Sequence, residues 1–293
     1  MVPAWALGPP STTPVTSPPA SGPAKEQILN PRVSWQDLPA GLRHLIEAEA
    51  GSFIRAEQVG TGHNCLVGMV MHTTRDRYFL KGVPADHKRA VWTQSNEAAI
   101  NSHVRHVSAP LAFHVAADGW DVLGFRYLDA QHADLSPGSP DLSKITASLQ
   151  ALNAIPAPDG LMLRTAEDRW RGYAGDHAHL LAGTTVAHTD LHRHNILIDG
   201  TAKFIDWAWP TLAAPWFDTA CVGLQLIHAG HTPKDAELWC QDSPAFAAAS
   251  EQAVTTFVTA ARRLWAEIAI ADPQQWKVEV AEAACTWAAY RNG

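Results

Sequence analysis

The chain has 293 residues, of which 46% are apolar and 17% charged, so it can bury a large core in one large domain or two lobes. Its 22 basic and 29 acidic side chains give a net charge of −7, with no block of Lys and Arg. Nucleic acids and anionic membranes are bound by concentrated positive charge, so we expect neither partner. No apolar run reaches the roughly 18–20 residues that a membrane-spanning helix needs.

Cysteine and proline usage indicates the environment of the protein. The four cysteines are far apart and form no CxxC pair, which argues against a zinc knuckle and a disulfide framework. We therefore expect a reducing, cytoplasmic setting. Seven of the 20 prolines fall in the first 23 residues, which breaks any apolar core of a signal peptide. We predict that residues 1–32 form a disordered, proline-rich tail.

Residues 33–125 are predicted to form a β-rich lobe. Apolar residues recur at helical spacing over 38–46, and a further helix is expected over about 91–107. The other apolar runs are short, rich in β-formers and bounded by turn residues. The predicted strands are Phe53–Val59, Cys65–His72, Tyr78–Val83, Ala112–Ala117 and Trp120–Phe125.

Residues 126–293 are predicted to form a larger, mainly helical lobe. A helix begins at about Asp141, and another runs from Thr165 to about Leu181, with a capping box at its start. Two short strands follow, over 196–198 and 203–205, on either side of an Asp-Gly turn. The Ala, Leu and Trp content from Pro215 to Arg291 predicts helices throughout.

The string with most chemical content is HTDLHRHN at 188–195, followed by FIDW at 204–207. A carboxylate and a carboxamide five residues apart on one loop can face different partners. Asp190 is suited to accept the proton of a hydroxyl group. Asn195 and Asp206 supply hard oxygen ligands, which suit Mg²⁺ beside phosphate oxygens.

This string resembles the catalytic loop of the aminoglycoside phosphotransferase family, small-molecule kinases with the protein-kinase fold. The resemblance implies a bilobal α+β fold, with a β-rich N-lobe containing one helix and a larger helical C-lobe. It implies that Asp190 is the catalytic base, that Asn195 and Asp206 bind metal, and that His188 braces the loop. Asp218 resembles the family residue that braces the same loop; the alternative is an ordinary helix N-cap.

The sequence departs from the protein-kinase pattern at three positions of these strings. Thr189 replaces an Arg, which favours the small-molecule branch. Trp207 and Ala208 replace Phe-Gly, and no second acidic residue follows Asp206. The case for a second metal ion is therefore weaker than for the first.

The N-lobe, residues 33–125, carries further matches, which imply that it binds the nucleotide phosphates. Lys81 lies on the third predicted strand and Glu97 on the helix after it, where the family has a phosphate-binding Lys and its ion-pair partner. Two glycines lie in a turn that could cover phosphates, and two aromatic residues lie where the family binds adenine. These four residues are Gly60, Gly62, Phe125 and Tyr127.

We therefore expect a phosphotransferase that uses Mg²⁺ and ATP, or GTP, to phosphorylate a hydroxyl group of a small molecule bound by residues 126–293. A nucleotide-binding pseudokinase is one alternative, and a zinc hydrolase using His188, His192 and His194 is another. Residues 207–293 have nine acidic and five basic side chains, too few carboxylates to indicate a polycationic acceptor. The same stretch has seven tryptophans, which either pack the core or line a pocket for a nucleoside, macrolide, sugar or quaternary amine. The oligomeric state is not indicated.

Overall fold

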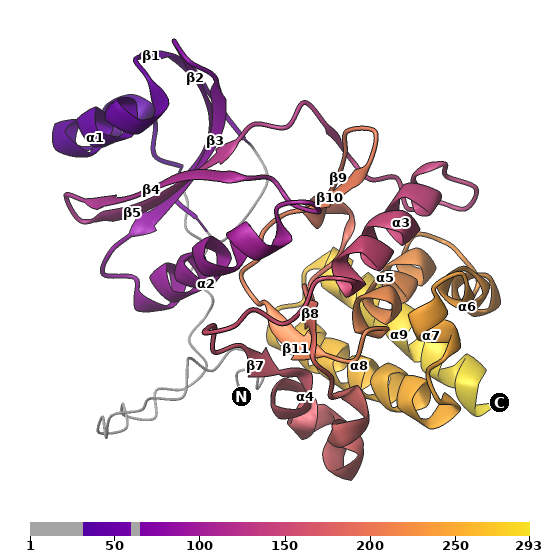
Figure 1. Cartoon of the computed structure of the whole chain (residues 1–293). Helices are drawn as coiled ribbons and strands as arrows, with labels where there is room; N and C mark the ends of the chain where they lie inside the picture. Colours follow the sequence, from indigo (N-terminus) through magenta and orange to yellow (C-terminus); the bar gives the residue numbers. More distant parts are fainter. Residues whose placement is uncertain (1–31, 60–64) are drawn as a thin grey trace, which may run out of the picture. The chain divides into compact units, whose positions relative to one another are not determined.

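The computed structural model describes residues 32–59 and 65–293. The predicted tail, except Arg32, and the turn containing Gly60 and Gly62 lie outside the described residues. The chain divides into two compact units (Figure 1). Of the described residues, unit 1 contains 32–59, 65–105 and 109–129, and unit 2 contains 106–108 and 130–293.

Unit 1 is built on an antiparallel sheet of five strands in the order β1-β2-β3-β5-β4. The strands are β1 (Phe53–Gln58), β2 (Val67–Thr73), β3 (Arg77–Pro84), β4 (Leu111–Ala117) and β5 (Trp120–Arg126). All five predicted strands are confirmed, with ends that shift by one or a few residues. Asp118 and Gly119 join β4 to β5 with φ angles of 49° and 79°, the positive values that a two-residue hairpin turn requires.

Two α-helices cover opposite faces of this sheet. Because side chains alternate along a strand, Leu80 and Lys81 of β3 point to different faces. Leu80 belongs to the apolar core that also contains Leu42 and Ile46 of α1 (Ala40–Ala50). Lys81 contacts the other helix, α2 (Lys88–Val104), which is inserted between β3 and β4. A short 3-10 helix, η2 (Trp35–Asp37), precedes α1.

Unit 2 is mainly helical, and in Figure 1 its last two long helices, α8 and α9, run side by side. The α-helices are α3 (Asp141–Asn153), α4 (Ala166–Ala174), α5 (Phe217–His228), α6 (Pro233–Gln241), α7 (Pro244–Ala247), α8 (Glu251–Ala271) and α9 (Gln275–Asn292). The mixed α+β fold class is thereby confirmed. In the parts of the chain that the structure describes, no helix combines the length and apolarity needed to cross a bilayer.

Two small sheets lie between these helices and flank the loop 188–195. The strands are β6 (Gln131–His132), β7 (Arg164–Thr165), β8 (Thr185–Ala187), β9 (Ile196–Ile198), β10 (Ala202–Phe204) and β11 (Thr211–Ala213). One sheet has the order β10-β9-β6 and the other β7-β11-β8. The sequence predicted β9 and β10, but not the other four, because two or three residues are too few to show an alternating pattern.

One predicted helix is too long. Thr165 is the N-cap of α4, since its Oγ1 accepts a hydrogen bond from the Asp168 amide, and its hydroxyl also contacts the Asp168 carboxylate; α4 ends at Ala174. Gly175 has a φ angle of 60°, which ends an α-helix, and the chain continues to Leu181 as the 3-10 helix η3.

An aromatic cluster forms the core of unit 2. Phe257 of α8 lies 5.2 Å from Trp170 of α4 and 5.1 Å from Phe217 of α5, measured between ring centroids. Trp207, Trp216 and Trp287 are also buried. Core packing therefore accounts for three of the seven C-terminal tryptophans, whereas Trp209, Trp239, Trp265 and Trp276 are partly or largely exposed.

The ion pair between His114 and Asp121 makes the stability of unit 1 depend on pH. Their side chains lie 2.8 Å apart, and the hydrogen bond to Asp121 raises the pKa of His114 above 6.5. The pair therefore stabilises the fold below the unfolded pKa of about 6.5, and this contribution is lost as the pH rises through the folded pKa. We expect His114→Gln to lower the free energy of unfolding more at about pH 5.5 than at about pH 8.5, by less than roughly 1 kcal/mol because the ring is partly exposed. Equal effects in urea denaturation at both pH values would contradict the pair.

Candidate active site

The predicted contact between Lys81 and Glu97 is present in unit 1. The Lys81 ammonium nitrogen lies 2.6 Å from Glu97 Oε2. The two residues are only 9% and 3% exposed, because the sheet and α2 close around them. A charge in such a place is stable only with a partner, so each residue holds the other in a defined position.

The two predicted adenine-binding residues lie near the end of β5. Phe125 pairs with Phe79 across the sheet, two residues along β3 from Lys81, so Phe125 and Lys81 share one face. Its ring is buried. The ring of Tyr127 lies 4.6 Å from the Arg77 guanidinium, and its backbone amide donates to the Arg77 carbonyl oxygen.

The other predicted site residues lie in unit 2, on the loop after β8. His188 is 1% exposed, and both of its ring nitrogens form hydrogen bonds to the backbone. Nε2 lies 2.9 Å from the carbonyl oxygen of Ile205 and donates to it, while Nδ1 accepts from the amide of Asp190 at 3.3 Å. The imidazole therefore bridges Asp190 and the residue before Asp206 as a neutral ring.

The carboxylate of Asp218, on α5, holds the same loop through two backbone amides of the loop. Its Oδ2 accepts from the amide of His188 at 2.6 Å, and its Oδ1 accepts from the amide of Thr189 at 2.8 Å. Burial raises the pKa of Asp218 to about 6, while the two amide donors act against this rise. The N-cap of α5 is Trp216, so the alternative reading of Asp218 as an N-cap is wrong.

Asn195 is bonded to the residue that is predicted to be the base. Its amide nitrogen Nδ2 donates to the backbone carbonyl of Asp190 at 2.9 Å. Because a carbonyl oxygen only accepts hydrogen bonds, the NH₂ group of Asn195 must face it. The side-chain oxygen Oδ1 therefore points elsewhere. The side chain is 6% exposed, which restricts its rotation.

Asp190 and Asp206 are close enough for their charges to interact. Burial raises the pKa of Asp190, the charge of Asp206 adds to this rise, and His192 and Arg169 oppose it. Thr189 and Asp206 have φ angles of 67° and 64°, a left-handed conformation that is uncommon for residues with a side chain. Such backbone strain is concentrated at functional sites.

The structure adds one residue that the sequence did not indicate. Arg169 of α4 is 4% exposed and donates from Nη1 to Thr189 Oγ1 at 2.8 Å. It lies within a predicted helix and belongs to no motif, so no sequence signal distinguishes it from a surface arginine.

The histidines of the zinc hypothesis are not arranged as a set of metal ligands. His188 uses both ring nitrogens for the backbone, and His192 Nδ1 accepts from the amide of His194. Among residues 32–59 and 65–293, no three His, Cys, Asp or Glu side chains are placed to hold a metal ion.

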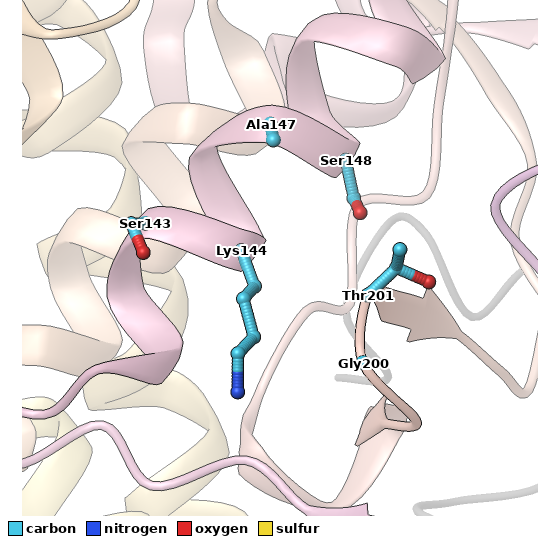
Figure 2. Close-up of a pocket in the computed structure, with 6 residues that line it drawn as sticks. All are labelled: Ser143, Lys144, Ala147, Ser148, Gly200 and Thr201. Atoms are coloured by element: carbon cyan, nitrogen blue, oxygen red, sulfur yellow. The ribbon is translucent and has the colours of Figure 1, made fainter.

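A surface cavity of about 260 Å³ lies elsewhere in unit 2 (Figure 2). It is lined by α3 and the β9–β10 turn, and its one charged side chain, Lys144, pairs with Asp141 at 2.9 Å. None of its lining residues belongs to the loop 188–195, and none is a carboxylate. The cavity therefore offers no group for the chemistry described above.

Solved structures with a similar fold were found, although no protein-family model and no curated protein matches the sequence. The choline kinase LicA of Streptococcus pneumoniae superposes with a TM-score of 0.58 at 15% identity, covering 86% of this chain and 100% of that chain. This chain therefore has the fold of small-molecule kinases. An aminoglycoside phosphotransferase of Alicyclobacillus acidocaldarius superposes with a TM-score of 0.56 at 14% identity. The match covers 87% of this chain and 93% of that chain. An aminoglycoside phosphotransferase of Streptomyces rimosus, solved with ADP and streptomycin, superposes with a TM-score of 0.52 at 16% identity. This match covers 74% of this chain and 94% of that chain.

This small-molecule kinase fold confirms the predicted protein-kinase-like architecture. The likeness in fold therefore extends over most of the chain, beyond the short motifs that indicated it. At these identities the likeness concerns the fold, and the chemistry must be argued from the residues themselves.

Asp218→Asn tests how much the brace contributes. Asn keeps the shape but replaces one acceptor with an NH₂ group that faces a backbone amide, so a buried donor loses its partner. We expect the free energy of unfolding, measured with urea, to fall by roughly 1–3 kcal/mol. The control Asp159→Asn, at an exposed position in the turn before Gly160, should change it by less than about 0.5 kcal/mol. Equal effects of the two substitutions would contradict the brace.

Proposed function

We propose that the protein is a phosphotransferase that uses Mg²⁺ and ATP to phosphorylate a hydroxyl group of a small molecule. The observation that carries the proposal is the bond from Asn195 Nδ2 to the Asp190 carbonyl. It orients the carboxamide oxygen of Asn195 and connects this side chain to the backbone of Asp190, so the proposed metal ligand and the proposed base are held in one loop.

The metal ligands that we propose fit a magnesium ion. Asn195 Oδ1 is left available by the orientation of the amide, and Asp206 supplies a carboxylate held by a left-handed backbone. Magnesium prefers oxygen ligands and is usually held by one or two protein groups together with phosphates and water. When bound, the ion would neutralise charge on the phosphate oxygens.

Asp190 is the proposed base. It accepts the proton of the acceptor hydroxyl as that oxygen forms a bond to the γ-phosphorus, and the bond from the γ-phosphorus to the bridging oxygen breaks to leave ADP. The raised pKa of Asp190 supports this role, because a carboxylate with a higher pKa accepts a proton more readily.

Unit 1 is proposed to bind the nucleotide. Lys81, held by Glu97, would contact the α- and β-phosphates, and the ring of Phe125 lies on the same sheet face as Lys81. The ADP complex of the Streptomyces rimosus protein supports a nucleotide ligand for this fold. ATP is the proposed donor, and GTP is the alternative.

The acceptor is proposed to be a small molecule without several ammonium groups. Over residues 217–293, most carboxylates already have partners. Glu237 contacts Arg291, Asp272 contacts Lys277, and Glu267 accepts from Tyr173. An aminoglycoside needs several carboxylates to meet its ammonium groups, so a neutral or singly charged acceptor fits better.

The pseudokinase alternative is less well supported than the enzyme. A pseudokinase commonly lacks one catalytic group, whereas Lys81, Glu97, Asp190, Asn195 and Asp206 are all present, and the first two are in contact. The two hypotheses differ in turnover, because only the enzyme consumes ATP when Mg²⁺ is added.

Asp190→Asn tests the mechanism by separating catalysis from nucleotide binding. Asn keeps the size of the side chain but removes its charge and basicity. Phosphoryl transfer, measured with an acceptor or as slow transfer to water, should fall by roughly 10²–10⁴-fold, the usual contribution of a general base. The Kd for ATP, measured by calorimetry, should change by no more than a few-fold.

Two variants complete this experiment. Asp199→Asn removes an exposed carboxylate in the β9–β10 turn and should change neither quantity. Lys81→Ala should weaken ATP binding as well as transfer, because it removes the proposed phosphate contact. Full transfer by Asp190→Asn would contradict the assignment of the base.

A further inference from the structure

A buried arginine contacts Thr189 of the proposed catalytic loop and the segment 209–211, which follows Asp206. Arg169 Nη1 donates to Thr189 Oγ1 at 2.8 Å and to the carbonyl oxygen of Trp209 at 3.0 Å. It also contacts Thr211 Oγ1. Thr189 directly precedes the proposed base, and Trp209 follows the proposed metal ligand Asp206 by three residues. One side chain therefore connects the two segments that carry the proposed chemistry.

The carbonyl oxygen of Trp209 is the centre of this network. It accepts from Thr189 Oγ1 at 3.2 Å and from Thr211 Oγ1 at 2.8 Å, in addition to Arg169. The Trp209 ring also lies 5.6 Å from the guanidinium. These contacts fix the backbone that follows Asp206, where φ is 64°, and the position of Thr189, whose φ is 67°, beside Asp190.

The arginine is a poor choice if its role is only to stabilise the fold. Burial, with a contribution from Arg164, lowers the pKa of Arg169 to about 10, so the group is charged at neutral pH. Within the described residues its Nε has no hydrogen-bond partner. A buried cation with an unpaired N–H loses much of its hydration, and an apolar residue of similar volume often gives equal or higher stability.

We propose that Arg169 is a positioning residue, which holds the catalytic loop at Thr189 in a defined place relative to the Trp209–Thr211 segment. One guanidinium nitrogen, Nη1, makes the contacts with both segments, so a single group links them. A misplaced base or metal ligand slows a reaction strongly even when the substrates still bind. The expected loss of kcat rests on the proposed function, whereas the expected loosening of the two segments does not.

The test compares Arg169→Met with Arg171→Met, which removes an exposed arginine of the same helix. Arg169→Met should lower kcat by at least about 10-fold while the Kd for ATP changes by less than about 3-fold. Arg171→Met should leave both unchanged. Thr189→Val, which removes the hydroxyl that Arg169 contacts, should lower kcat, and the double variant should be no slower than Arg169→Met within about two-fold, because both changes break one network.

Hydrogen exchange supplies a measurement that does not depend on turnover. In Arg169→Met the amides of residues 188–195 and 206–211 should exchange faster, while those of α8 and α9 stay as protected as before. If Arg169→Met does not fold, Arg169→Lys and Thr189→Val are compared in the same way. A kcat equal to that of the wild type in a folded variant, or faster exchange spread evenly over unit 2, would overturn the proposal. If the wild-type protein transfers no phosphoryl group, the proposed function fails, and hydrogen exchange alone decides the role of Arg169.

Discussion

The arrangement of the loop 188–195, which carries the proposed base, depends on one buried carboxylate. Asp218 accepts hydrogen bonds from two consecutive amides, at 2.6 and 2.8 Å, and so fixes the backbone directly before Asp190. Hydrogen bonds to a charged group contribute about 1.5–3 kcal/mol, enough to hold Thr189 in its strained conformation. The loop of unit 2 is thus positioned by a helix that begins after β11, late in the chain.

Hydrogen bonds from other side chains to the backbone fix further residues of the loop. His188 connects the amide of Asp190 to the carbonyl of Ile205, and Asn195 connects its own side chain to the carbonyl of Asp190. In unit 1, the pair of Lys81 and Glu97 is held in the same way by burial between sheet and helix. Each unit therefore orders the side chains to which a function is proposed.

Those parts of the fold and site whose signals are local could be predicted from the sequence. The five strands of unit 1 alternate or are bounded by turns, and β9 and β10 flank an Asp-Gly turn. The family resemblance implies a pair of Lys81 and Glu97, on a strand and on the helix after it, and the structure places them in contact. The fold itself followed from the resemblance of short strings at 188–195 and 204–207.

The rest depends on contacts between distant residues. The strands β7, β8 and β11 have two or three residues each and exist because they pair with one another. Arg169 differs from the exposed Arg171 only in the side of α4 on which it lies and in what packs there. The end of α4 at Gly175 was missed because the apolar pattern continues through the 3-10 helix. The acceptor is not identified, since the helices that follow Asp218 carry no motif.

The most direct test of the account is a screen for phosphoryl transfer. The protein is incubated with ATP, Mg²⁺ and a panel of hydroxylated metabolites and antibiotics, and each product is examined by mass spectrometry. The account predicts that at least one compound gains the mass of one phosphate, and that Asp206→Asn, which loses the carboxylate of a proposed metal ligand, gives no product. Folded wild-type protein that binds ATP but shows neither product nor magnesium-dependent ATP hydrolysis would contradict it.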